Sequence, residues 1–265
     1  MSINRVICAL PVLIIALVGC RKDDDKRDRD LSAATDQSRA EDVFADMLAV
    51  VDQAVKDNGL RDLCDPAVTF DTSATPRTIT IDFGDVNCTA GNGRSRRGRI
   101  LVSYTGRYRD PGTVITITPE DYHVNDNHVT GVKTVTNMGL NANDQPWFTV
   151  SMDGAITAAD GSWTATHQAQ RTRTWIEGFD TPALQDDVYE ITGSGSGVNR
   201  NGVSYTSEIT QALRVELGCA WRMVSGRVTI TPSGRLPRTI DYGDGSCDAT
   251  FTVTEGWQPF RVTRG

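Results

Sequence analysis

Histidine is scarce in this sequence, which has three among its 265 residues: His123, His128 and His167. Zinc in proteins usually takes four His, Cys or carboxylate ligands. Three scattered histidines do not form such a set, so we expect no metal site and no cofactor. No Gly-x-Ser-x-Gly motif occurs, which excludes the nucleophile elbow of the α/β-hydrolases, and no two carboxylates are marked out as a glycosidase pair. We therefore predict no catalytic residue.

An excess of basic residues is also absent. The chain has 27 Lys and Arg against 34 Asp and Glu, a net charge of −7. Residues 1–19 contain one basic residue, Arg5, and no acidic one, so without them the balance is 26 against 34, or −8. Nucleic-acid binders need a basic stripe for phosphate contacts. We expect no nucleic-acid partner.

Long apolar runs are missing after Gly19. The run from Val6 to Gly19 is too short for a stable membrane-spanning helix, and Arg5 precedes it, as in a cleavable export signal. Leu17-Val18-Gly19-Cys20 resembles the bacterial lipobox, in which the cysteine is diacylated and becomes the first mature residue. The resemblance implies removal of residues 1–19 and a membrane anchor through lipid on Cys20.

Residues 20–36 are charged and nearly free of large apolar groups, so we expect a disordered tether. Its start, Lys22-Asp23-Asp24-Asp25, resembles the surface-export signal of Bacteroidota lipoproteins. This implies an outer-membrane lipoprotein exposed on the cell surface. The alternative is an ordinary solvated linker on a protein that faces the periplasm.

Four cysteines remain once Cys8 leaves with the signal and Cys20 carries lipid, and an even number in an exported protein indicates disulfides. An internal repeat suggests the pairing. Each of the segments 64–88 and 219–247 runs from cysteine to cysteine through Pro-Arg-Thr-Ile and Asp-aromatic-Gly-Asp. A hairpin brings the ends of each unit together, so we predict the pairs Cys64–Cys88 and Cys219–Cys247.

One amphipathic helix is predicted at residues 37–58, with Asp36 or Ser38 as its cap and Glu41 and Asp42 near its positive end. Its apolar stripe has helical spacing and consists of Val43, Phe44, Met47, Leu48, Val51, Ala54 and Val55. We expect the helix to pack on the domain's own sheet through Phe44, Met47, Leu48 and Val51.

From Val68 onward apolar and polar residues alternate, as in antiparallel strands with one buried face; the clearest case is 203–217. Gly- and Asn-rich breaks at 91–93, 110–112, 160–161, 199–202 and 233–234 separate the strands. We predict a single all-β domain over 37–265, an antiparallel meander that forms a sandwich or flattened barrel, with the helix packed on it.

Several of these segments together resemble a family of uncharacterised Bacteroidota lipoproteins. They are the lipobox, Ile81-Asp82-Phe83-Gly84-Asp85, Tyr104-Thr105-Gly106-Arg107-Tyr108, Ile191-Thr192-Gly193, Asn199-Arg200-Asn201-Gly202 and Ile240-Asp241-Tyr242-Gly243-Asp244. The resemblance supports export and implies no activity, substrate or catalytic residue.

A possible ligand face follows from strand parity, which places Trp163, Arg171, Arg173 and Trp175 on one side of a strand together with His167. Tryptophan and arginine side by side suit sugar stacking. The alternative is a pair of core or rim tryptophans whose neighbouring arginines extend to solvent.

An arginine cluster and two aspartate motifs can each be interpreted either as a binding site or as part of the structure. Arg94, Arg96, Arg97 and Arg99 can hold an anionic group or simply form a solvated hairpin tip. The motifs Asp82-x-x-Asp85 and Asp241-x-x-Asp244 can contribute to a calcium site, but they suit turns better.

These patterns favour a lipid-anchored, exported, non-catalytic protein that binds a glycan or an envelope protein, or contributes to the envelope itself. Three alternatives stay open. A glycan-binding module would expose Trp163 and Trp175 together. A hydrolase of an envelope or extracellular polymer would bring two carboxylates or a Ser/His pair into a cleft. A lipid carrier would leave an apolar concave face uncovered by the helix.

Overall fold

The computed structural model describes residues 30–56, 65–91 and 93–263 of the chain. These residues form one α-helix, α1 (Ser32–Lys56), and one antiparallel sheet. The strands are β1 (Ala67–Asp71), β2 (Arg77–Asp82), β3 (Cys88–Thr89), β4 (Ser95–Tyr104), β5 (Val114–Val124), β6 (Asn127–Leu140), β7 (Pro146–Thr157), β8 (Thr164–Glu177), β9 (Val188–Val198), β10 (Ser204–Glu216), β11 (Met223–Pro232), β12 (Arg238–Asp244), β13 (Thr250–Glu255) and β14 (Gln258–Thr263).

The sheet is a meander. Its strands follow chain order from β1 to β14, except that the short β3 lies off this path and pairs with β4. The predicted breaks at 110–112, 160–161, 199–202 and 233–234 all fall between strands, because glycine and asparagine adopt the backbone angles of tight turns without strain. The predicted all-β antiparallel meander is confirmed.

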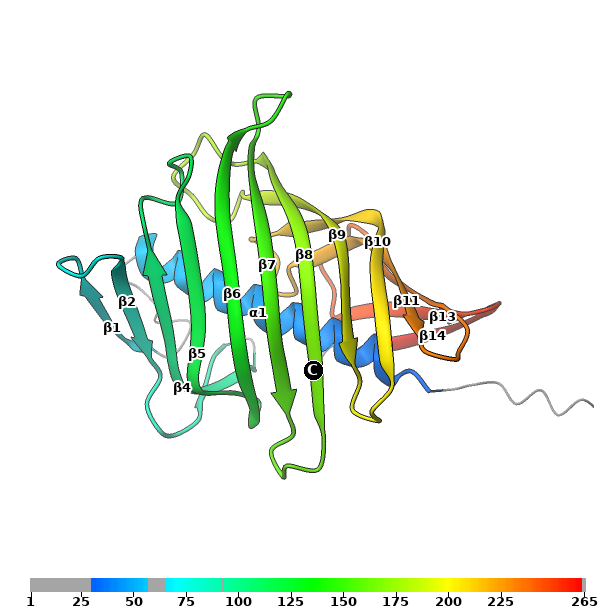
Figure 1. The fold of residues 1–265 in the computed structure, drawn as a ribbon. Helices are drawn as coiled ribbons and strands as arrows, with labels where there is room; N and C mark the ends of the chain where they lie inside the picture. Colours follow the sequence, from blue (N-terminus) through cyan, green and yellow to red (C-terminus); the bar gives the residue numbers. More distant parts are fainter. Residues whose placement is uncertain (1–29, 57–64, 92, 264–265) are drawn as a thin grey trace, which may run out of the picture.

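The sheet curves around α1 and does not close into a barrel. Figure 1 shows the helix running across the strands, with β4–β8 on one side and the C-terminal strands curving round it. The helix contacts β5, β7 and β8 as well as β11. The flattened-barrel alternative is therefore wrong, and the arrangement resembles a sandwich whose two halves belong to one sheet. Among the described residues, α1 lies across the curved face of the sheet, against β5, β7, β8 and β11.

The predicted apolar stripe of α1 is buried in the core. Phe44 has 1% of its surface exposed, and Met47, Leu48 and Val51 are also buried. The ring of Phe44 lies over Gly154 of β7, where a Cβ atom would come within 2.2 Å of the ring's Cζ atom. The docking of the helix through these residues is confirmed, although Val55 at the end of the stripe is exposed.

The helix is buried on other sides too, which the stripe did not predict. Ala49 and Val50, which lie well off the Phe44 face, are buried, and the helix contacts β11 as well as β5, β7 and β8. The helix thus lies inside the sheet, whereas the sequence predicted that it packs on the sheet.

The helix begins at Ser32, so the predicted start at 37 and the predicted tether end at 36 are wrong. Asp30 caps it by accepting a hydrogen bond from the Ser32 amide at 2.9 Å. Asp36 is neither a cap nor part of a tether but a buried residue of the second turn. Residues 20–29 of the predicted tether, and 57–58 at the predicted helix end, lie outside the described residues.

The two copies of the internal repeat form the same local structure. Its Pro-Arg-Thr-Ile segments lead into β2 and β12, and in each copy the aspartate after isoleucine accepts a hydrogen bond from the glycine amide two residues on. Cys219 and Cys247 form a disulfide, with their Cα atoms 5.7 Å apart, which confirms that pair. Cys64 lies outside the described residues, so the Cys64–Cys88 pair stays a prediction.

Candidate functional site

The predicted ligand face lies on the inner side of the sheet. Arg171, Arg173 and Trp175 belong to β8 and lie on its buried side, as does His167. Trp175 is 1% exposed, and both arginines are buried. The threonine and glutamine row of the same strand faces solvent instead. Trp163 and Trp175 are therefore not exposed together, and the sugar-stacking surface expected of a glycan-binding module is not present.

Arg171 and His167 hold a carboxylate of the helix. The Arg171 guanidinium donates a hydrogen bond to Glu41 Oε1, and His167 Nε2 lies 3.2 Å from the same oxygen. The other ring nitrogen of His167 is 3.1 Å from the Tyr205 hydroxyl. Burial alone would raise the pKa of Glu41, but the charge of Arg171 and the His167 contact outweigh it and hold that pKa well below its ordinary value. Glu41 is thus an ionised carboxylate inside the protein.

Arg173 lies among aromatic rings. Its guanidinium carbon is 3.5 Å from the centroid of the Tyr189 ring, and one nitrogen donates to the Tyr108 hydroxyl at 3.3 Å. Trp175 stacks on Tyr189 with ring centroids 5.3 Å apart. Burial raises the pKa of Tyr108 to about 12 and that of Tyr189 well above its ordinary value, so both rings stay neutral while Arg173 keeps its charge. This cation–π cluster fills the core where the sequence suggested a sugar site.

Trp163 lies just before β8 and is covered by two cations. The guanidinium of Arg200 lies 4.5 Å from its ring centroid and that of Arg39 5.3 Å. Arg200, in the β9–β10 turn, also binds Asp36 of the helix through its side chain and its backbone amide. Trp163 therefore helps to fasten the start of α1.

Ion pairs recur along the helix, and we call this set the helix–sheet ionic interface: Asp36 with Arg200, Glu41 with Arg171, and Asp46 with Arg94 and Arg96. The partners of Asp36, Glu41 and Asp46 lie in the β9–β10 turn, on β8, and on and just before β4, in that order. The helix thus crosses the strands in reverse chain order. Each pair holds its own section of the sheet.

Asp46 shows how fully these charges are satisfied. Arg96, whose side chain is 1% exposed, gives it hydrogen bonds of 2.7 to 3.1 Å, and Arg94 lies 3.1 Å away. Burial opposes ionisation of Asp46, but the charges of Arg94 and Arg96 keep its pKa below the ordinary value. Arg97 and Arg99 pair with Asp126 and Glu120 on the outer surface. All four arginines of this cluster thus bind carboxylates of the chain itself.

A cavity of about 60 Å³ lies between the helix and the sheet. Charged groups line it beside apolar ones, among them Lys133, Arg173 and Asp52. Lys133 donates to the Phe44 carbonyl of α1 at 3.0 Å. Burial, together with the charge of Arg173, lowers the pKa of Lys133 to about 8. The space suits a few ordered waters and is too small for a sugar.

The aspartate motifs of the repeat serve turns. Asp82 and Asp241 accept bonds from the amides of Gly84 and Gly243, and Asp244 accepts one from the Ser246 amide. These are Asx turns, so the turn interpretation is confirmed for these three residues.

Two of the three histidines, His123 and His128, come together in the structure, although their spacing in the sequence did not predict a site. The β5–β6 hairpin turns through Asn125 and Asp126, both with positive φ, which is the conformation of a two-residue type I′ turn. His123 of β5 therefore lies directly opposite His128 of β6, with ring centroids 4.8 Å apart.

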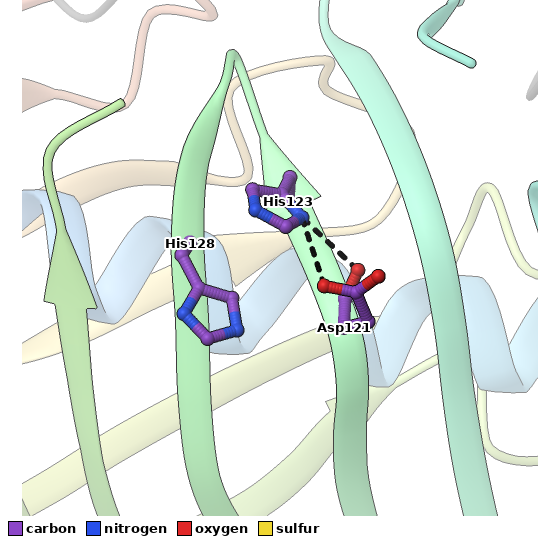
Figure 2. A group of neighbouring side chains, drawn as sticks. All are labelled: Asp121, His123 and His128. Atoms are coloured by element: carbon purple, nitrogen blue, oxygen red, sulfur yellow. Dashed lines mark hydrogen bonds and ion pairs between the residues drawn. The ribbon is translucent and has the colours of Figure 1, made fainter. Parts of the chain in front are cut away.

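Asp121, two residues before His123, projects to the same side (Figure 2). Its backbone oxygen is 3.0 Å from His123 Nδ1, and its carboxylate oxygen is 4.0 Å from that nitrogen. The pattern His-Val-Asn-Asp-Asn-His could have predicted the pairing, because Asn and Asp are the residues that tolerate a type I′ turn.

No family model matches the chain, and neither a curated protein nor a solved structure is detectably similar to it. Within the described ranges no helix is long and apolar enough to cross a membrane. Cys20, the predicted lipid attachment site, lies outside those ranges. The site residues must therefore be interpreted from their geometry alone.

Proposed function

We propose that this chain is an exported lipoprotein, held at the outer membrane by lipid on Cys20, and that it acts there without catalysis as a binding or structural protein of the envelope. The observation that carries the proposal is the position of α1, because the first described element after the predicted anchor is also the centre of the core. An anchor joined to a peripheral helix could pull that helix loose, whereas this helix is buried against β5, β7, β8 and β11.

The distance to the membrane is short in this account. Eleven residues, 21–31, separate Cys20 from Ser32, and they span at most about 40 Å when fully extended. The Ser32 hydroxyl accepts a bond from Asn199 at 2.6 Å, and Asp30 pairs with Arg235 at 3.0 Å. The β9–β10 and β11–β12 turns therefore lie at the end of the molecule nearest the anchor.

The pairing of carboxylates with arginines supports a non-catalytic role. The inner carboxylates Glu41 and Asp46 are bound to arginines of the sheet. On the outer surface, Glu120 pairs with Arg99 and Glu177 with Arg214. Such pairs fasten elements to each other and leave these carboxylates poorly placed for acid–base work. Among the described residues, Trp163 and Trp175 do not form the exposed pair that a glycan-binding module would need.

Lipid labelling tests the anchor. In a bacterium that expresses the chain and is fed radiolabelled palmitate, we expect Cys20→Ala to abolish labelling and to release the protein from the membrane fraction. Cys8→Ala changes a cysteine within the signal and serves as the matched control, with labelling retained. Undiminished labelling of Cys20→Ala would refute the anchor.

Protease treatment of intact cells tests the membrane side. Surface exposure predicts digestion of the wild-type protein, and protection in a variant with Asp23, Asp24 and Asp25 all changed to Asn. Wild-type protein that resists protease until the outer membrane is opened would mean that it faces the periplasm.

A further inference from the structure

We propose that Asp121, His123 and His128 form a binding site for a divalent transition-metal ion, Zn²⁺ or Cu²⁺, on the outer face of the β5–β6 hairpin. One ligand atom from each residue lies within 4.8 Å of the others. Figure 2 shows the three side chains gathered on neighbouring strands. Imidazole and carboxylate are the ligand types that these ions take in proteins.

The backbone fixes the two imidazoles. In a two-residue hairpin the pair next to the closing pair is not hydrogen-bonded to each other, and side chains approach most closely at such pairs. His123 and His128 occupy that pair. The turn itself is tied to β4, because Asn125 accepts a bond from the Ser95 amide at 2.9 Å through its side chain and donates one to the Ser95 carbonyl at 3.0 Å. The fold therefore already holds the two histidines side by side, and little conformational entropy is lost when an ion binds them.

An irregularity in β5 places the carboxylate. Asp121 has φ of 46°, and the β4–β5 register shifts between Arg97 and Arg99. The intervening Gly98 makes this possible, because a Cβ atom there would lie 1.9 Å from the Asp121 carbonyl oxygen. β-Bulges often re-aim a side chain in this way.

The tautomer of His123 suits a metal ligand. The carbonyl oxygen of Asp121 can only accept a hydrogen bond, so Nδ1 of His123 is the donor at 3.0 Å. In a neutral imidazole this leaves Nε2 with its lone pair. Metal-ligating histidines commonly make such a bond from the nitrogen that does not hold the metal.

Neighbouring positive charge is already compensated. Arg97 faces His123 across the strand pair, but it lies 2.6 Å from Asp126. Arg99 likewise lies 2.8 Å from Glu120. A cation that approaches the histidines therefore meets arginines whose charge is largely offset, together with the carboxylate of Asp121.

The three ligand atoms can reach metal-binding distance by movement of side chains alone. Ligands bound at about 2.0–2.2 Å lie roughly 3–3.5 Å from each other around a tetrahedral ion. The Asp121 side chain is 84% exposed, so its carboxylate can rotate toward an ion held by His123 Nε2. Three protein ligands leave a fourth position open to water, so the site would exchange its metal with solvent and would not be a closed structural centre.

Isothermal titration of the purified full chain with ZnCl₂ tests the proposal. We expect one ion per chain with a dissociation constant in the micromolar range. His128→Ala should weaken binding at least tenfold and Asp121→Asn severalfold, while Thr157→Ala, opposite His128 on β7, should leave it unchanged. Asp144→Asn is the matched carboxylate control, because Asp144 also has a positive φ, 58°, which asparagine tolerates.

Electron paramagnetic resonance of the Cu²⁺ form provides a second readout. We expect hyperfine coupling to two imidazole nitrogens, falling to one in His128→Ala. No zinc binding at millimolar concentration, or equal affinity in His128→Ala and wild type, would overturn the proposal. Circular dichroism of each variant should match the wild type, since all the changed side chains lie outside the core.

Discussion

The contact between Phe44 and Gly154 gives the sharpest test of how the helix is held. Phe44→Ala removes a fully buried ring from a slot that only a glycine leaves open. Substitutions of this kind cost about 3–5 kcal/mol. With a urea slope of about 2–3 kcal/mol/M, the unfolding midpoint should fall by roughly 1.5 M. Val55→Ala, at an exposed position of the same helix, should change stability by less than about 0.5 kcal/mol.

A double-mutant cycle separates this contact from general damage. Gly154→Ala alone should cost about 1–3 kcal/mol by overpacking, since its new methyl would meet the Phe44 ring. In the Phe44→Ala background the cost should be smaller, although not zero, because the Thr130 carbonyl oxygen lies 2.8 Å from the same point. We expect a coupling of at least about 1 kcal/mol. Additive effects, or a Phe44→Ala midpoint equal to wild type at unchanged slope, would refute this account of the core.

Three further predictions concern the buried charges and the disulfide. The charge of Arg171 outweighs burial and holds the pKa of Glu41 below its ordinary 4.5, so ionised Glu41 stabilises the fold above about pH 4.5 and this stabilisation is lost in acid. Urea titrations should show that acid destabilises Glu41→Gln less than wild type, and equal pH profiles for the two proteins would contradict the prediction. Burial lowers the pKa of Lys133 from 10.5 to about 8, so wild-type stability should rise between pH 8 and pH 10.5. Lys133→Met should be up to about 3 kcal/mol more stable than wild type at pH 7. A clear loss of stability in that variant would contradict the lowered pKa of Lys133. Changing both Cys219 and Cys247 to serine removes a link across 28 residues and should cost about 3–4 kcal/mol, and an unchanged thermal midpoint would show that the link does not constrain the unfolded chain.

Local periodicity accounts for what the sequence predicted correctly. Alternation in β10 and the spacing of Phe44, Met47 and Val51 depend on neighbours within a few residues, so the strand and the helix could both be predicted from the sequence. The helix start was missed because Ala33 and Ala34 give a weak apolar signal and Asp36 reads as a cap. In the structure Asp36 is buried against Arg200, 164 residues away.

The ligand face shows where local information ends. Parity correctly placed Arg171, Arg173 and Trp175 on one side of β8, but it does not say whether that side faces water. Arginines can lie inside here because helix carboxylates reach them, as Glu41 reaches Arg171 across 130 residues. The pairing of His123 with His128, by contrast, depends on a two-residue turn and was within reach of the sequence.

Hydrogen exchange measured by mass spectrometry tests most directly the claim that the sheet is built around α1. A helix enclosed by the sheet can exchange its amides only when the core opens. Peptides from 32–56 should therefore be as slowly exchanging as those from the central strand β7, 146–157, and far slower than those from the edge strand β1, 67–71. Fast exchange throughout α1, while β7 stays protected, would show that the sheet holds together without the helix and would contradict the account.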